Sequence, residues 1–239
     1  MEKLHPALLA SQQNLPTDTP VHLLTRHSIR EDAGNDFADG SVPLTEEGIA
    51  LAYEWGQHLS LPIQALFSSP VGRCVDTAMH MAAGAHRASK LLLAAHTQPV
   101  IAASLVEPGC FVVDVNQAGP EFFRLGAQGF INRYLTESMP GMLTPTAGLT
   151  KLATYLYQRQ RQVNAASLAV HVTHDTILAA FVSALQGKPR IGAEDWPWMM
   201  EGLWCWFGVE GMHWIWRGEQ GLLPLFFQPD GSVIAQPSY

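Results

Sequence analysis

The chain has 239 residues, of which 47% are hydrophobic and 15% are charged, and its formal net charge is -7. This composition is typical of a core-rich globular protein, and the lack of a basic run argues against a nucleic-acid partner. Three cysteines without metal-ligand spacing exclude a disulfide framework, and an N-terminus unlike a signal peptide favours a cytoplasmic protein that binds no membrane.

Short apolar runs alternate with helical patterns along the chain. The predicted strands cover 20–26, 63–70, 97–109 and 167–175, and a predicted hairpin covers 203–217. The predicted helices follow Thr45 as an N-cap, then cover 72–85, 120–136, 146–162 and 176–187. This alternation predicts an α/β fold: a three-layer sandwich with a mainly parallel central sheet and helices on both faces. The hairpin is expected to add antiparallel strands.

We expect a single domain over 1–239, in which the less regular segment 110–145 forms a lid or insertion. Surface packing of an inserted helix is the alternative for this segment. Six of the seven tryptophans lie within 196–216, where alternation favours packing in the sheet. An aromatic wall of a substrate pocket, or the face of a homodimer, is the alternative for these side chains.

Charged and nucleophilic residues follow the predicted strands. In a parallel sheet, ligands bind beyond the carboxyl ends of the strands, so these residues are expected to meet. They are Arg26, His27 and Arg30 after the first strand, Ser68, Ser69 and Arg73 after the second, Glu107 after the third, and His174 and Asp175 after the last.

Three arginines at one sheet edge would repel one another unless an anion lay between them. A phosphoryl group supplies that charge and accepts forked hydrogen bonds from guanidinium groups, so no metal or other cofactor is required. A neutral histidine among the arginines can attack phosphorus, and a carboxylic acid can protonate the leaving oxygen.

Four segments resemble motifs of the histidine phosphatase superfamily, which includes phosphoglycerate mutase-like and histidine acid phosphatase branches. They are "TRHSIR", "PLTEEG", "SSPVGRCVDTA" and "VTHDTI", in chain order from Arg26 to Ile177. The resemblance implies a phosphoglycerate mutase-like fold in which His27 becomes phosphorylated. It also implies that Arg26, Arg30, Arg73 and His174 bind the phosphoryl group.

Two positions depart from this pattern or leave it open. Ser28 replaces a glycine, and its hydroxyl is a further candidate ligand of the phosphoryl group. The proton donor is Asp175 if the chain follows the acid phosphatase branch and Glu107 if it follows the mutase-like branch. Chain size and the "LTEEG" and "SSPVGRC" segments favour Glu107, and Asp175 can instead cap the following helix.

The expected activity is that of a metal-independent phosphomonoesterase, a hydrolase that acts on a phosphorylated small molecule through a phosphohistidine intermediate. A mutase would return the phosphoryl group to its substrate. A non-catalytic phosphoryl-binding module would keep the arginines without turnover. A metal-dependent hydrolase is a further alternative, against which the spacing of the ten histidines argues. The identity of the substrate stays open.

Overall fold

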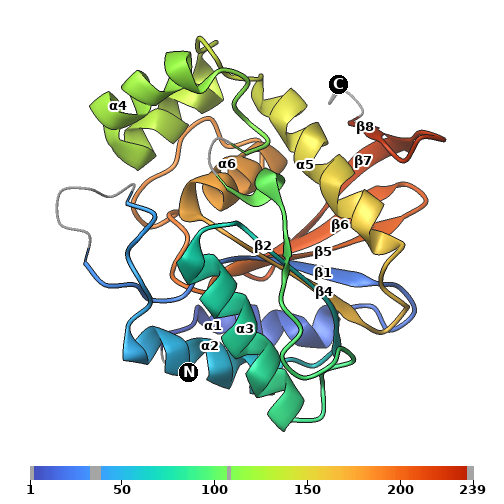
Figure 1. Cartoon of the computed structure of the whole chain (residues 1–239). Helices are drawn as coiled ribbons and strands as arrows, with labels where there is room; N and C mark the ends of the chain where they lie inside the picture. The colour runs from blue at the N-terminus through green and yellow to red at the C-terminus, as the bar shows by residue number, and fades with distance from the viewer. Residues whose placement is uncertain (1–2, 33–38, 107–108, 236–239) are drawn as a thin grey trace.

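The computed structural model describes residues 3–32, 39–106 and 109–235. Within these residues, eight strands form one sheet in the order β3-β2-β4-β1-β5-β6-β7-β8 (Figure 1). The strands are β1 (Val21–Arg26), β2 (Ile63–Ser68), β3 (Val100–Ile101), β4 (Leu168–Thr173), β5 (Gly202–Gly208), β6 (Gly211–Trp216), β7 (Glu219–Phe227) and β8 (Val233–Ala235).

The sheet has a parallel half and an antiparallel half. Strand β4 pairs in parallel with β1 and β2, and β2 pairs in parallel with β3. From β1 outward, each pairing through β5, β6, β7 and β8 is antiparallel. The predicted α/β fold is confirmed, with a parallel core. The antiparallel part is larger than one hairpin because short turns join β5 to β6, β6 to β7 and β7 to β8, and a short turn permits only antiparallel neighbours.

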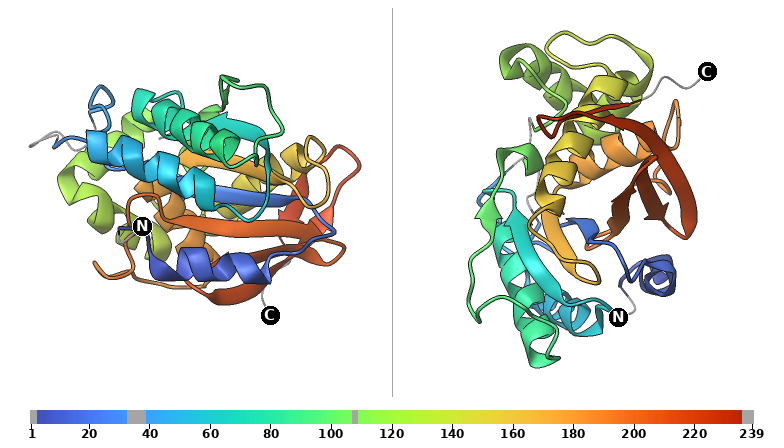
Figure 2. Two further views of the ribbon diagram at one scale, coloured as in Figure 1. Left: turned by 90° about the horizontal axis from the view of Figure 1, so that it is seen from below. Right: turned by 90° about the vertical axis from the view of Figure 1, so that its right-hand side faces the viewer.

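Helices cover both faces of the sheet (Figures 1 and 2). One face carries α1 (Pro6–Ala10), η1 (Ser11–Asn14), α2 (Glu46–His58) and α3 (Gly72–Arg87). The other face carries α4 (Val115–Thr136), α5 (Pro145–Gln160) and α6 (Asp175–Leu185), and η2 (Ala103–Leu105) lies next to β3 in the chain. None of the helices described here is long and apolar enough to cross a membrane.

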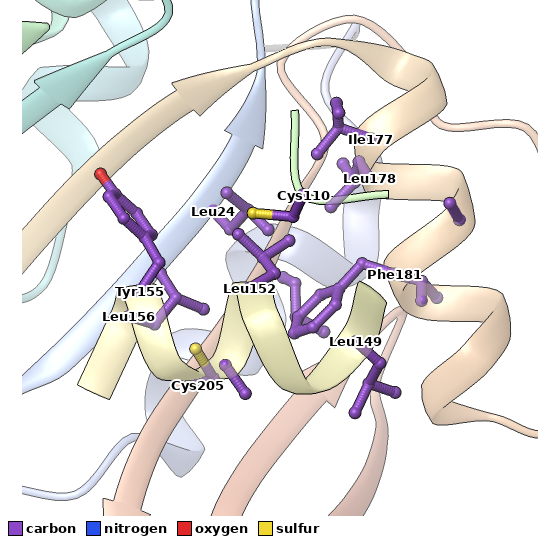
Figure 3. Close-up of a cluster of buried hydrophobic side chains, with 14 of the residues drawn as sticks. Leu24, Cys110, Leu149, Leu152, Tyr155, Leu156, Ile177, Leu178, Phe181 and Cys205 are labelled. Atoms are coloured by element: carbon purple, nitrogen blue, oxygen red, sulfur yellow. The ribbon is translucent and has the colours of Figure 1, made fainter. Parts of the chain in front are cut away.

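The two faces of the central strands feed two hydrophobic cores. In β4, Val170 and Val172 pack toward α2 and α3, whereas Ala169 packs toward α5 and α6. This alternation follows from the two-residue period of a strand. Figure 3 shows the core between the sheet and helices α5 and α6, where Leu152 of α5 and Phe181 of α6 pack together.

Two predicted elements have different bounds in the structure, and one helix lies where none was predicted. The strand expected at 97–109 is limited to Val100–Ile101 and is followed by the η2 turn. Helix α1 lies before the first strand, and Leu4 and Leu8 of this N-terminal segment are buried. Helix α4 begins before residue 120 and is kinked at Gly126, whose φ of 67° is outside the helical region.

Candidate active site

The ends of three parallel strands lie level with one another. Arg26 of β1 pairs with Thr173 of β4, and Ser68 of β2 pairs with Val172 of β4. The next residue of each strand, His27, Ser69 and His174, is therefore held at the same edge of the sheet. Beyond this edge lies a cavity of about 610 Å³. Five of the predicted site residues line it: His27, Arg30, Arg73, His174 and Asp175.

The hydrogen bonds of His27 define its tautomer. Its Nδ1 lies 2.8 Å from the carbonyl oxygen of Ser28, which can only accept, so Nδ1 carries the proton. Its Nε2 accepts a hydrogen bond of 3.1 Å from Nε of Arg73. Burial, followed by the charge of Arg26, holds the pKa of His27 well below its usual value. His27 is thus neutral, with a lone pair on Nε2 beside a guanidinium group.

Two hydrogen bonds, to His27 and to Asp39, hold the side chain of Arg73 in place. It lies in the first turn of α3, and its side chain is buried beside His27. Besides the bond to His27, its Nη1 donates to the carbonyl oxygen of Asp39 at 2.8 Å. These two bonds fix the orientation of the guanidinium group in the wall of the cavity.

His174 lies across the cavity edge from His27. The two ring centroids are 5.6 Å apart, with an angle of 71° between the planes. Nε2 of His174 lies 2.9 Å from Oγ of Ser69 and 3.6 Å from Sγ of Cys74. Burial, with the charge of Arg73 as the second cause, lowers the pKa of His174 to about 4. This histidine is therefore neutral near pH 7.

Arg26 and Asp175 form an ion pair at the side of the cavity. Nη2 of Arg26 lies 2.7 Å from Oδ2 of Asp175, and Nη1 donates to the carbonyl oxygen of Pro197 at 2.6 Å. Trp196 Nε1 also donates to Asp175, at 3.3 Å. Burial by itself raises the pKa of Asp175, but the charge of Arg26 and the hydrogen bonds from Thr176 N and Trp196 Nε1 bring it below its usual value. Asp175 lines the cavity, whereas Arg26 is not part of the described lining.

The hydroxyl of Ser28 is bonded away from the cavity. Its Oγ donates to the carbonyl oxygen of Gly48 at 2.7 Å, and its backbone N donates to Oγ1 of Thr77 at 3.0 Å. The serine that replaces the expected glycine therefore connects the loop after His27 to α2 and α3.

The "LTEEG" segment packs directly under this loop. Thr45 caps α2 by accepting from the backbone N of Gly48 at 2.9 Å, as the sequence predicted, and its own N donates to Ile29 O at 3.0 Å. A Cβ at position 48 would lie 2.0 Å from the same carbonyl oxygen. Glycine is required there because the chain that carries His27 crosses α2 in contact with its backbone.

Arg30 lines the cavity and forms an isolated antiparallel bridge with Leu44. Glu107, the alternative proton donor, lies outside the described residues. Its sequence neighbour Val106 lines the cavity.

Side chains other than the predicted phosphoryl ligands also support the site. Ser69, expected at this edge of the sheet, contacts His174. Thr77 accepts from Ser28 N; it belongs to the quoted "SSPVGRCVDTA" segment, but the strand-end pattern does not reach it. Trp196 contacts Asp175 and lines the cavity, a position compatible with the aromatic-wall alternative. Trp204 and Trp214 are instead buried in the sheet, as their alternation predicted.

Helix α4 forms the far wall of the cavity. Phe122, Ala127 and Gln128, which flank the kink at Gly126, are among the lining residues. The segment predicted as a lid or insertion therefore lies beside the predicted phosphoryl site.

The described residues form an α/β protein with one mixed sheet flanked by helices, a fold that solved structures share. The family model described as histidine phosphatase superfamily (branch 1) matches residues 23–94, which include His27 and Arg73. No curated protein sequence matches the chain. The match agrees with the resemblance of this part of the chain to the histidine phosphatase superfamily.

Solved structures with the same fold are distant in sequence. One is YhfR of Bacillus stearothermophilus, at 17% identity and a TM-score of 0.53, covering 84% of this chain and 98% of that chain. Another is a mycobacterial glucosyl-3-phosphoglycerate phosphatase, at 16% identity and a TM-score of 0.51, covering 83% of this chain and 99% of that chain. These likenesses show the fold.

Proposed function

We propose that the protein is a phosphomonoesterase that works through a phosphohistidine on His27. The observation that carries this proposal is the tautomer of His27. Ser28 O can only accept and Arg73 Nε can only donate, so both partners place the lone pair on Nε2. A neutral imidazole nitrogen beside a guanidinium group is suited to attack phosphorus while the phosphoryl oxygens are held.

The cavity has the charges that a phosphoryl group requires. Arg30 and Arg73 supply positive charge along its lining, and His174 supplies a ring nitrogen near His27. We assign the phosphoryl oxygens to these three side chains. The assignment of Arg26 and Ser28 to the same group stays a prediction, because the contacts described above engage Arg26 with Asp175 and Ser28 with Gly48.

For the proton donor we favour Glu107 over Asp175. Asp175 is paired with Arg26, and its lowered pKa keeps it ionised near pH 7, so it is a poor proton donor in this arrangement. We infer that Asp175 orients Arg26 and shapes the cavity wall. Glu107 follows Val106, which lines the cavity, and this supports its assignment as the acid.

The proposed reaction has two steps. In the first, Nε2 of His27 forms a bond to phosphorus while the bond to the ester oxygen breaks, and that oxygen takes the proton of Glu107. In the second, water attacks phosphorus, the ionised Glu107 takes a proton from the water, and the bond to Nε2 breaks. Inorganic phosphate leaves, and both residues return to their starting states.

The buried thiols of Cys74, Cys110 and Cys205 agree with a reducing, cytoplasmic setting.

The test is hydrolysis of an aryl phosphate in EDTA by the wild type and by the His27→Ala variant. We expect loss of nearly all activity in His27→Ala, and an acid-labile, base-stable phosphoenzyme in the wild type alone. His86→Ala, which removes an exposed histidine of α3, serves as the matched control. Turnover by a folded His27→Ala protein would contradict the proposal. Phosphoryl transfer between substrate positions without phosphate release would favour the mutase, and binding without turnover would favour the non-catalytic module.

A further inference from the structure

A second cavity lies next to the predicted phosphoryl site. Its volume is about 260 Å³, and α4 and α6 supply much of its wall. The two cavities share Phe122 and Thr176 as wall residues, so they adjoin each other. Val115 and Phe123, at 55% and 64% exposure, line the second cavity, which therefore reaches the surface.

The two cavities differ in chemistry. The phosphoryl cavity is lined by arginine, histidine and aspartate side chains, whereas the second cavity has no charged side chain in its described lining. Phenylalanine, valine and isoleucine side chains supply most of that lining, so water gains few hydrogen bonds inside it. Such a surface favours hydrocarbon groups, because their transfer from water is favourable.

Two hydroxyl groups belong to this apolar wall. Tyr134 and Thr176 are 1% and 6% exposed, and neither hydroxyl oxygen has a hydrogen-bond partner among the described residues. Burial raises the pKa of Tyr134, so its hydroxyl stays protonated and able to donate. These are the only side-chain hydroxyl groups in the described lining, and both oxygens are buried, so the surface offered to a ligand is apolar.

From these observations we propose that the second cavity binds the leaving group of the substrate, and that the substrates are phosphate monoesters of apolar alcohols. The proposal rests on the phosphatase function proposed above and adds the substrate class. A cavity of roughly 150 Å³ lined by apolar side chains is large enough for benzene. The volume of about 260 Å³ found here fits a six-carbon chain or a single ring with substituents.

The test uses phosphate monoesters of primary alcohols from ethyl to hexyl, because their leaving groups differ little in acidity. Burial of each added methylene is expected to raise kcat/KM about fourfold. A glycerol phosphate of similar size, which places hydroxyls where the wall is apolar, should be a poorer substrate than butyl phosphate.

Two variants reduce the cavity from different helices. A Cβ at Gly119 of α4 would meet no described heavy atom within 4 Å, so Gly119→Leu can occupy this space without a backbone clash. Ala180→Leu places a larger side chain in the wall that α6 supplies, and so reduces the cavity volume. The matched control is Gly129→Leu, which adds the same side chain to α4 at a position outside the lining of this cavity. Circular dichroism checks that each variant folds.

The proposal is supported if kcat/KM rises with chain length in the wild type and in Gly129→Leu, and if this rise is lost in the two cavity variants. It is overturned if the dependence on chain length is flat, or if both folded cavity variants keep it. If no ester is hydrolysed at all, the phosphatase proposal fails, and equilibrium binding of ethyl- to hexylphosphonate decides the second cavity. Affinity that rises with chain length and is lost in Gly119→Leu then supports the subsite, and a flat dependence overturns it.

Discussion

The parallel and antiparallel halves of the sheet contribute differently to the site. In the parallel half, β1, β2 and β4 run in the same direction, so their carboxyl ends bring His27, Ser69 and His174 to one edge. In the antiparallel half, successive strands end at opposite edges of the sheet. Convergence of strand ends is a property of parallel strands, and the described cavity lies where it occurs.

Residues of the antiparallel half bond to the backbone of residues at the site. Glu201 precedes β5, and its carbonyl oxygen accepts from the backbone N of Arg26 at 2.9 Å. Its carboxylate accepts from Nε and Nη2 of Arg217, at 2.7 and 2.9 Å. Arg217 also donates to the carbonyl oxygen of Trp196, beside Asp175. Substitutions in the parallel half should therefore reduce activity, and those in the antiparallel half should mainly reduce stability.

After His27, the largest expected effect is at Arg73. Arg73→Ala removes the donor to His27 Nε2 and one cation of the cavity, and we expect kcat/KM for an aryl phosphate to fall about a thousandfold. Arg73→Lys should recover little, because an ammonium group lacks the forked donors of the guanidinium group. Arg87→Ala, an exposed position at the other end of α3, is the control. Near-normal activity of Arg73→Ala would contradict the view that the parallel half supplies the catalytic contacts.

The proton donor can be identified from leaving-group dependence. With an alkyl phosphate, whose leaving oxygen needs a proton, Glu107→Gln should lower kcat about a hundredfold or more. With a nitrophenyl ester the same variant should lose far less activity. Asp175→Asn should affect both esters to a similar extent, because it disturbs Arg26 and the cavity wall. The reverse pattern would make Asp175 the acid.

In the antiparallel half, Glu201→Gln should reduce the free energy of unfolding by about 2 kcal/mol, because it breaks a largely buried bidentate ion pair. Denaturant unfolding measures this change. Activity of the folded variant should fall less than threefold, since its carboxylate does not line the described cavity. Glu210→Gln, at an exposed contact with His213, is the control and should change stability by less than about 0.5 kcal/mol. A large loss of kcat in Glu201→Gln would contradict this division.

Strands β1 and β4 of the parallel half carry a buried histidine pair. Nδ1 of His22 lies 3.0 Å from Nε2 of His171, and burial lowers the pKa of His22 to about 3 and that of His171 well below its usual value. Unfolded histidine binds a proton near pH 6.5, which the folded pair cannot do, so stability falls as the pH drops from about 6.5 toward 3.

Between pH 6.5 and 5 the loss should be about 2 kcal/mol for each such histidine. His22→Gln should make the dependence of unfolding free energy on pH less steep, although the variant is less stable at pH 7. Leu24→Ala, a neighbouring core change without a titratable group, should lower stability by the same amount at each pH. Equal slopes in the wild type and His22→Gln would show that His22 is accessible to protons in the folded protein.

Most elements of the parallel half could be predicted from the local sequence. Apolar runs of strand length, the Thr45 cap and the motifs after each run predicted β1, β2, β4, their helices and the meeting of His27, Arg73 and His174. These features depend on short-range patterns and on the general geometry of parallel sheets. The predicted third strand was too long, because its apolar residues continue into the η2 turn.

The sequence by itself determined the α/β class and the chemistry of the residues at the strand ends. Only the tertiary structure decided which partner each side chain takes. It pairs Arg26 with Asp175, bonds the Ser28 hydroxyl to Gly48, and separates Trp196 at the cavity from Trp204 in the core. It also placed an apolar cavity beside the polar one. Such contacts join residues far apart in the chain, and a periodic pattern specifies which face is buried but not which distant group it meets.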